Sequence, residues 1–353
     1  MRAVPEFDMR RGPRYVPVLR TKQAEWTALR QLRADVRHAI TPCLEVLPSE
    51  FVKGPQKLVT RIGRTWGSGP IFLDFGKIDP SNHHGNGDHP ITELARAASG
   101  GAINPTIVVR TYDDEAFLMA AQRALSAYPT LSVAIRIHYA DLEKQFSAGE
   151  INSILLALGS IHEDSDLIVD YDVIDATPPD YDWLCSRVPL LSKWRRFIVT
   201  GGSFPPDLNG LHVGIRAQPR YDWIHWQNWA ESPHARVART PDFGDYTIQH
   251  PVFEEPPEGA NPSASIRWAT ESYWLIARGE ALRSKKSSGH LQYYGNAQLL
   301  CECGEIEEPA FSYGDTYLWN AANRRGGPGN PTTWIAAGEN HHITLTASQV
   351  AAL

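Results

Sequence analysis

The sequence predicts an α/β fold: a (β/α)8 barrel of the TIM type over residues 1–255, with a mostly helical C-terminal extension over residues 256–353 packed on it. The chain has 353 residues, enough for a tail beside one barrel, since α/β barrels reach about 250 residues as one unit. Short apolar runs rich in Val and Ile alternate with longer amphipathic segments. This alternation is typical of parallel strands buried on both faces.

The predicted strands are short, and a helical segment follows each of them. The strands are expected at residues 15–19, 40–46, 71–74, 106–110, 132–137, 167–170 and 196–200. The first helix starts at Thr21, with Trp26, Leu29 and Leu32 at helical spacing. The other helices are expected at residues 51–66, 90–98, 114–127, 142–158, 180–191 and 221–230.

The eighth strand is the least obvious element. We expect it at residues 244–249, and residues 213–215 are the rival position. A doubly wound open sheet is the alternative fold, but its dinucleotide-binding form carries glycines in the turn after the first strand. Residues 20–22, Arg-Thr-Lys, occupy that turn here, which favours the barrel.

The extension has a different pattern. Residues 264–278 are expected to be extended, and residues 289–301 and 316–323 helical. Two short final elements are expected at residues 332–338 and 345–353.

Composition excludes several classes of protein. A formal net charge of −6 argues against an extended surface for duplex nucleic acid, which would need clustered Lys and Arg. The apolar runs are too short to cross a bilayer, and the Arg-rich start of the chain is unlike a secretory signal. Four cysteines, two of them isolated, do not form a disulfide scaffold. We therefore expect a cytoplasmic protein without membrane contact.

Several motifs together resemble the beta protein family of phage satellites and bacterial defence loci. They are YVPVLRTK (15–22) with Glu25, ITPCLEV (40–46), FGDY (243–246), IRW (266–268) leading to YWLIARG (273–279), and Trp334 followed by GENHH (338–342). Their order and spacing extend the resemblance over nearly the whole chain. Because members occur beside other defence genes, the resemblance implies a role in anti-phage defence. It implies no reaction.

Ionisable residues fall at the C-terminal end of nearly every predicted barrel strand, where active sites of this fold lie. These residues are Arg20 with Lys22, Glu45, Asp74 with Lys77, Arg110, Arg136 with His138, and Asp170 with Asp172. Burying so many charges is unfavourable unless they are paired or solvated. The sequence therefore predicts a water-filled, charge-balanced cup, and a salt-bridge network that closes the mouth is the alternative.

The residue types at the rim suggest roles in such a cup. Glu45, Asp74 and Asp170 are the candidate acid–base residues. Arginines grip phosphate or carboxylate with two hydrogen bonds, so Arg110 and Arg136, with Arg20 and Lys22, would hold an anion. Gly201, Gly202 and Ser203 follow the seventh strand, where this fold often binds phosphate. Asp245 and Tyr246 complete the rim. The three acids could instead hold a divalent metal through their oxygen atoms, but the sequence assigns no particular metal ligand and no cofactor.

Three residues of the extension are also candidate ligand-binding residues. If His341 and His342 lie in a strand, they point to opposite faces, so one could enter the barrel mouth. Arg278, which follows an apolar aromatic run, could contact a partner.

Two functional hypotheses follow. In the first, the barrel is a hydrolytic enzyme or a sensor that binds a phosphorylated or anionic small molecule at its mouth. In the second, the protein is a non-catalytic partner or regulator of another protein of a defence module.

Overall fold

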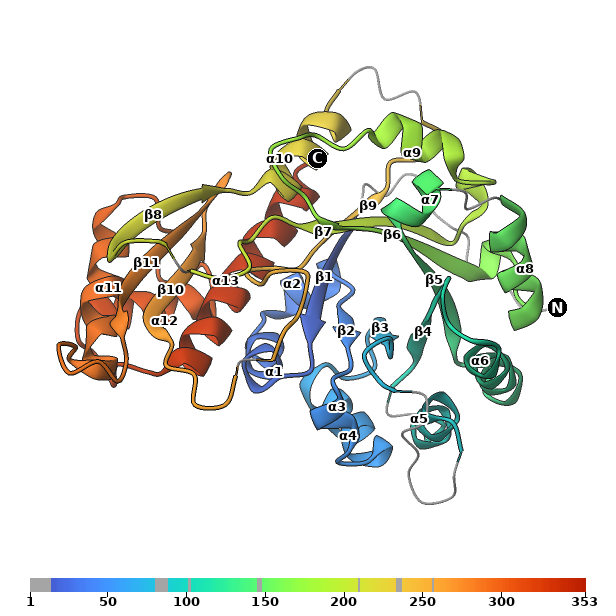
Figure 1. Ribbon diagram of the computed structural model, residues 1–353, viewed down its shortest axis with the longest axis horizontal. Helices are drawn as coiled ribbons and strands as arrows, with labels where there is room; N and C mark the ends of the chain where they lie inside the picture. The colour runs from blue at the N-terminus through green and yellow to red at the C-terminus, as the bar shows by residue number, and fades with distance from the viewer. Residues whose placement is uncertain are drawn as a thin grey trace.

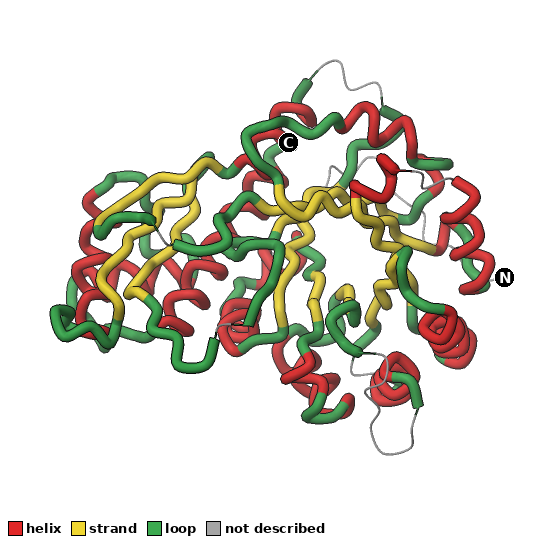
Figure 2. Tube along the Cα trace, in the orientation of Figure 1, coloured by secondary structure: helices red, strands yellow, loops and turns green. Residues whose placement is uncertain are grey.

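The computed structural model describes residues 14–79, 88–100, 103–144, 148–208, 210–232, 237–255 and 257–353. Eight parallel strands close into a barrel (Figures 1 and 2). In order around the barrel they are β1 (Tyr15–Arg20), β2 (Cys43–Glu45), β3 (Ile71–Asp74), β4 (Pro105–Arg110), β5 (Ser132–His138), β6 (Ser165–Val173), β7 (Arg196–Gly202) and β9 (Asp242–Asp245). The predicted (β/α)8 barrel is confirmed.

Strand β9 closes the barrel. Phe243 lies opposite Val199 of β7 on one side and opposite Tyr15 of β1 on the other. The eighth strand predicted at 244–249 overlaps β9, but the observed strand begins and ends earlier. Gly244 allows the close fit, because a Cβ there would lie 2.8 Å from the Thr200 side chain. The rival position at 213–215 is wrong, since it overlaps β8 (Gly214–Pro219) of a different sheet.

Helices surround the barrel (Figure 2). They are α1 (Gln23–Arg30), α2 (Ala34–Ala39), α3 (Pro48–Phe51), α4 (Pro55–Thr65), α5 (Pro90–Ala98), α6 (Glu115–Ala127), α7 (Tyr139–Lys144), α8 (Ala148–Leu158), α9 (Tyr181–Arg187) and α10 (Tyr221–Ala230). Short polar residues start some of them: Asp114 Oδ1 accepts from the Phe117 amide at 2.8 Å, and Asp180 caps α9 in the same way. Such N-caps satisfy amides that the first turn leaves free.

The strands alternate between two apolar environments. Tyr15, Leu19 and Leu44 belong to the large core between strands and helices. Val16, Val18 and Cys43 belong to a smaller cluster inside the barrel. The period of two residues that defines a strand therefore decides which side chains reach the barrel axis.

A second, antiparallel sheet lies beside the barrel (Figure 1). Its order is β10 (Ser263–Ala269), β11 (Tyr273–Ala281) and β8, and α11 (Gln292–Glu302) and α12 (Tyr313–Ala322) follow in the chain. β10 and β11 occupy the stretch expected to be extended. The division of the chain at residue 255 stays a prediction; β8 lies before that point in sequence and pairs with β11 after it.

The last helix, α13 (Pro331–Ala351), corrects the prediction of two short final elements. It is one helix of 21 residues that starts at the N-cap Asn330 and packs against α1, α2, β1 and β10. Gly338 is the last residue of the first predicted element, where it looks like a helix end. Its role is close packing, because a Cβ there would lie 2.5 Å from the Arg267 carbonyl oxygen. Burial of residues 334 and 336–347 on nearly all sides removes the apolar stripe that marks a surface helix.

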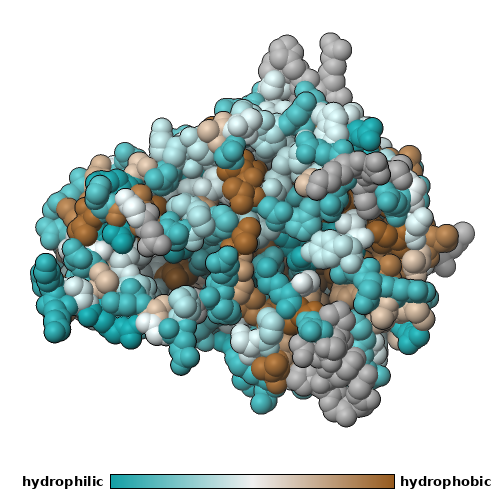
Figure 3. Space-filling view, in the orientation of Figure 1, coloured by the Kyte–Doolittle hydropathy of each residue, from teal (hydrophilic) through white to brown (hydrophobic). Residues whose placement is uncertain are grey.

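Among the described residues, no helix combines the length and the apolar character needed to span a bilayer. Figure 3 shows hydrophilic residues over much of the viewed face, with hydrophobic patches scattered between them.

Candidate functional site

Six charged side chains form a ring inside the C-terminal end of the barrel, which we call the mouth ring. Its members are Arg20, Glu45, Asp74, Arg110, Arg136 and Asp170. Glu45, for example, follows the inward-facing Cys43 by two residues, so the strand period directs it into the barrel. All six are buried.

Arg136 lies at the centre of the mouth ring. Its Nε and Nη2 donate to Asp170 Oδ2 at 3.0 and 2.5 Å, and its Nη1 donates to Asp74 Oδ2 at 2.5 Å. Nη1 also lies 3.4 Å from Glu45 Oε1. The Tyr246 hydroxyl contacts Arg136 and donates to Asp170 Oδ2 at 2.6 Å. One guanidinium thus joins three carboxylates from three strands.

Arg110 makes a second, two-pronged ion pair in the ring. Its Nε and Nη2 donate to Asp74 Oδ1 and Oδ2 at 3.1 and 2.7 Å. Burial favours the neutral form of Asp74, but Arg110 and Arg136 outweigh burial and hold the pKa of Asp74 below its usual range. Burial also favours the neutral form of Asp170. Arg136 and the hydrogen bond from Tyr246 outweigh burial, so the pKa of Asp170 is lowered as well. These carboxylates therefore stay ionised and paired.

The expected water-filled cup is in fact filled by its own side chains. Arginine side chains are long enough to reach across the barrel and satisfy the carboxylates directly. Three carboxylates and three guanidinium groups balance one another within the ring. The acid–base roles of Glu45, Asp74 and Asp170 stay predictions, and permanent ion pairing makes Asp74 and Asp170 poor proton carriers.

A histidine–aspartate pair lies beside the ring and is open to solvent. His138 Nδ1 is 2.8 Å from Asp172 Oδ2, and the two side chains are 25% and 45% exposed. The hydrogen bond to Asp172 raises the pKa of His138, against the opposing effect of burial. The Tyr112 ring stacks on the imidazole, with centroids 5.7 Å apart.

Backbone strain aims Asp172 at His138. Asp172 has φ of +55°, a left-handed conformation that is unfavourable for a residue with a Cβ and is concentrated at functional sites. Its amide donates to Asp170 Oδ1 at 2.9 Å, so the ring holds this turn in place. The sequence places both residues near the rim but assigns them no role.

His138, Asp170 and Asp172 bring potential metal-ligating atoms within 4.8 Å of one another. The fit to a metal is poor. Asp170 Oδ2 already accepts from Arg136 and Tyr246, and Oδ1 accepts from the Asp172 amide. Only two of the three groups could turn toward an ion without breaking the ring.

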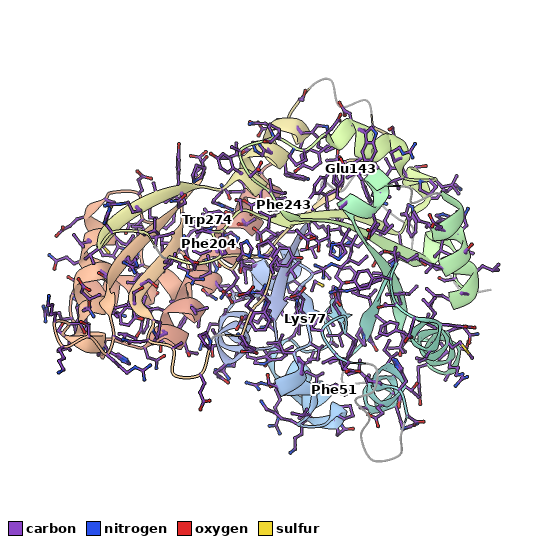
Figure 4. The ribbon with its side chains drawn as sticks, viewed as in Figure 1. Phe51, Lys77, Glu143, Phe204, Phe243 and Trp274 are labelled. Atoms are coloured by element: carbon purple, nitrogen blue, oxygen red, sulfur yellow. The ribbon has the colours of Figure 1, made fainter. Side chains whose placement is uncertain are left out.

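Three cations converge on one aromatic ring at the edge of the mouth. The Phe253 centroid lies 4.1 Å from Lys22 Nζ, 4.9 Å from Arg20 Cζ and 5.9 Å from Lys77 Nζ. Arg20 also donates to the His250 and Pro251 carbonyl oxygens, both at 2.7 Å, and so ties the segment after β9 over β1. Figure 4 labels Lys77, which follows β3. Phe253 has no local sequence signal, because its place depends on the path of a loop.

The predicted phosphate loop is packed tightly. Gly201 and Gly202 are buried residues of β7. A Cβ at these positions would lie 2.6 Å from Ile174 Cδ1 and 2.8 Å from Pro251 Cγ, respectively. Ser203 donates its hydroxyl to Asp222 at 2.9 Å. Close packing therefore accounts for both glycines, and phosphate binding there stays a prediction.

The two adjacent histidines lie on a helix, not in a strand, and both are buried in other contacts. His342 Nε2 is 2.7 Å from Asp245 Oδ2, and Tyr15 donates to the other oxygen of that carboxylate at 2.7 Å. Burial lowers the pKa of His342, against the opposing effect of the Asp245 carboxylate. Asp245 faces the outer wall of the barrel, whereas its neighbour Tyr246 faces inward to the ring.

His341 contacts the second sheet. Its Nδ1 lies 2.9 Å from Asp315 Oδ2, its Nε2 lies 2.9 Å from the Ala269 carbonyl oxygen, and its ring stacks on Trp268. Arg278 belongs to β11 and donates to the Leu211 carbonyl oxygen at 2.6 Å. The structure thus places Tyr246 in contact with the mouth ring and places Asp245, Arg278, His341 and His342 elsewhere.

A closed eight-stranded parallel barrel with surrounding helices and a charged mouth defines a TIM-barrel protein. The chain belongs to the beta protein family, whose model matches residues 15–348. A comparison with curated proteins finds none that matches.

Two solved structures show distant likeness. The YdjI aldolase from Escherichia coli K12 is 7% identical with a TM-score of 0.33, over 66% of this chain and 75% of that chain. The catalytic core of xylanase A is 12% identical with a TM-score of 0.32, over 67% and 87% of the two chains. Likeness at this level assigns no activity.

Proposed function

We propose that the mouth of the barrel binds a small phosphorylated or otherwise anionic ligand, and that His138 and Asp172 carry out acid–base chemistry, such as hydrolysis, on it. The observation that carries the proposal is the convergence of Arg20, Lys22 and Lys77 on Phe253. Lys77 lies 3.7 Å from Glu45 Oε2, but the three carboxylates of the mouth ring are already matched by its three arginines. Lys22 and Lys77 therefore leave the edge of the mouth with more positive than negative charge. Clustered cations raise the local concentration of anions.

The His138–Asp172 pair supports the chemical step. A general base must lie within hydrogen-bonding reach of the proton that it takes and must titrate near neutral pH. His138 is partly exposed at the rim, and Asp172 fixes the orientation of its ring. His138 would accept a proton from a water molecule as the water oxygen attacks the bound ester, and Asp172 would stabilise the resulting imidazolium. The bond to the leaving group would break, and the imidazolium would return its proton to the leaving oxygen.

Two further assignments accompany this proposal. We place the protein in anti-phage defence, which is supported by membership of the beta protein family and by what the sequence resemblance implies. We place it in the cytoplasm, which is supported by four cysteines that form no disulfide among the described residues.

The test is a thermal-shift screen with inorganic phosphate, sugar phosphates and nucleotides. A ligand at a hundredfold excess over its Kd stabilises the native state by about 2.7 kcal/mol. We expect one of these compounds to raise Tm, and we expect Lys22→Ala/Lys77→Ala to remove the shift. Lys285→Ala changes one exposed lysine far from the mouth and should leave the shift intact.

The chemical step is tested separately by incubating the shifting ligand with Asp172→Asn protein. Binding should persist while hydrolysis, measured as released phosphate or leaving group, falls. If no anion raises Tm, the non-catalytic partner hypothesis replaces this one. The self-contained pairing of the mouth ring favours that alternative, and pull-down of neighbouring gene products would then test it.

A further inference from the structure

The opposite, N-terminal end of the barrel contains a cavity of about 860 Å³. Its wall includes Thr41, Phe72, Thr106 and Ser132, together with Asp166 and Arg196. None of these residues belongs to the mouth ring. Pockets for small molecules have volumes of roughly 300–1,000 Å³, so this cavity has the size of a ligand site.

Small polar residues create the cavity. Phe72 lies opposite Thr106, and Thr106 lies opposite Ser132, so the three occupy one level of neighbouring strands. Two residues further along, Val108 and Ala134 belong to the apolar cluster that closes the barrel interior. TIM barrels usually fill every interior layer with bulky branched side chains. Here Thr106 and Ser132 present hydroxyl groups to the cavity in place of bulky side chains, beside the ring of Phe72.

The charged groups in and beside the cavity wall are equal in number: the cations are Arg14, Lys193, Arg195 and Arg196, and the acids are Glu163, Asp164, Asp166 and the adjoining Asp242. Arg195 donates to both oxygens of Asp166 at 2.9 and 2.7 Å. Arg196 Nε donates to Asp242 at 2.8 Å, and its guanidinium lies 5.5 Å from the centroid of Phe72. A wall of paired charges offers no net attraction to an ion.

One buried hydroxyl group of the cavity wall is available for a hydrogen bond to a ligand. Thr41 is 2% exposed, and within the described parts of the chain its Oγ1 makes no hydrogen bond. Buried hydroxyls are normally hydrogen-bonded. Because Thr41 lines the cavity, a bound molecule could supply the missing hydrogen bond.

We propose that this cavity binds a neutral ring compound that carries several hydroxyl groups, of the size of a monosaccharide or a nucleoside. Hydroxyl groups of the ligand would exchange hydrogen bonds with Thr41, Thr106 and Ser132. The balanced wall explains why the ligand is uncharged, and Phe72 with Arg196 provides the floor. This site is independent of the proposed anion site at the mouth.

The test is isothermal titration of the full chain with glucose, xylose, adenosine and uridine, and with inorganic phosphate as the anionic comparison. The separate arms distinguish a sugar from a nucleoside. Ser132→Leu restores the bulky side chain that barrels usually carry and should abolish binding. Thr41→Val keeps the shape but removes the hydroxyl, and should raise Kd by about three- to tenfold. Thr60→Val makes the same change on helix α4 and should leave Kd unchanged.

Circular dichroism melting confirms that each variant folds. If Ser132→Leu does not fold, the comparison of Thr41→Val with Thr60→Val decides the outcome. Binding of a neutral compound that depends on Thr41 supports the proposal. Binding that survives in a folded Ser132→Leu protein, binding of phosphate alone, or no binding of any probe would overturn it.

Discussion

At the scale of single residues, Arg136 does more than any other side chain to hold the barrel mouth together. It is 2% exposed and contacts carboxylates on β2, β3 and β6 as well as Tyr246. Removing one member of a buried ion-pair network leaves the remaining charges without compensation. Loss of activity in a ring variant could therefore reflect loss of the fold.

The first prediction concerns Arg136→Met, which keeps most of the side-chain volume but removes the charge. We expect the free energy of unfolding to fall by about 3–5 kcal/mol, measured by urea denaturation. Arg123→Met makes the same change at an exposed site on α6 and should change it by less than about 0.5 kcal/mol. Equal stability of the two variants would show that the mouth ring is not a structural network.

The second prediction concerns the pH dependence of His138. Its pKa is raised in the folded protein, chiefly by the hydrogen bond to Asp172, so protonation favours the folded state. The stabilisation is fully present below the unfolded value of about 6.5 and is lost as pH rises through the folded pKa. Asp172→Asn should lower the pKa of His138 and flatten this dependence.

NMR titration of the imidazoles measures the effect directly. His162 provides an internal comparison, because burial lowers its pKa. We expect the His138 resonance to titrate at a higher pH than the His162 resonance. The reverse order would mean that Asp172 does not hold His138 in solution as it does in this structure.

The sequence could predict part of the site, because one rule relates the position of a residue on a strand to its position in the barrel. The rule that strand ends meet at one face places all six members of the mouth ring correctly. It cannot tell whether those side chains face a ligand or one another, because that depends on distances across the barrel. Phe253 and Tyr112 reach the mouth from connecting segments, and their positions are set by tertiary structure alone.

At the scale of elements, the barrel strands were predictable and the last helix was not. Buried parallel strands are short and apolar, so their sequence pattern is direct evidence of their environment. Helix α13 is buried by the barrel on one side and by β10 on the other. Its polar and apolar residues are therefore not separated into an exposed face and a buried face. The aromatic residues Phe204 and Trp274, labelled in Figure 4, meet edge to face near this junction.

The third prediction tests how closely α12 approaches α13. A Cβ on Gly314 would lie 2.2 Å from the Ala337 carbonyl oxygen and 3.0 Å from His341 Cβ, so Gly314→Ala must push the two helices apart. We expect a loss of about 1–3 kcal/mol in the free energy of unfolding. Gly295→Ala on α11 meets nothing within 4 Å and should add about 0.5–1 kcal/mol through helix propensity.

Chemical denaturation of the two alanine variants gives the comparison. Opposite signs would confirm that the α12–α13 contact is tight. A stabilised Gly314→Ala protein would show that the two helices have room to move apart.

At the scale of the whole molecule, consecutive residues of α13 join the barrel to the second sheet. Glu339 accepts from Gln249 at 3.2 Å, and Asn340 donates to the Ala28 carbonyl oxygen at 3.0 Å. His341 contacts β10, and His342 contacts β9. The motif GENHH that carries part of the family resemblance therefore lies at the junction of the two parts of the molecule. A structural requirement explains this motif without a ligand.

The fourth prediction is that the barrel and the second sheet unfold together. Asn340 also accepts from the Gly314 amide at 3.2 Å, so one side chain connects α1 of the barrel with α12. Native-state hydrogen exchange should give amides of β1 and β11 the same free energy of opening, because neither part can lose α13 and keep its core. Asn340→Ala should lower both values together by about 1–3 kcal/mol, since it leaves two buried backbone groups unpaired. If β11 opens well below β1, or if the substitution lowers only one value, the barrel and the second sheet are independent folding units and α13 is only a contact between them.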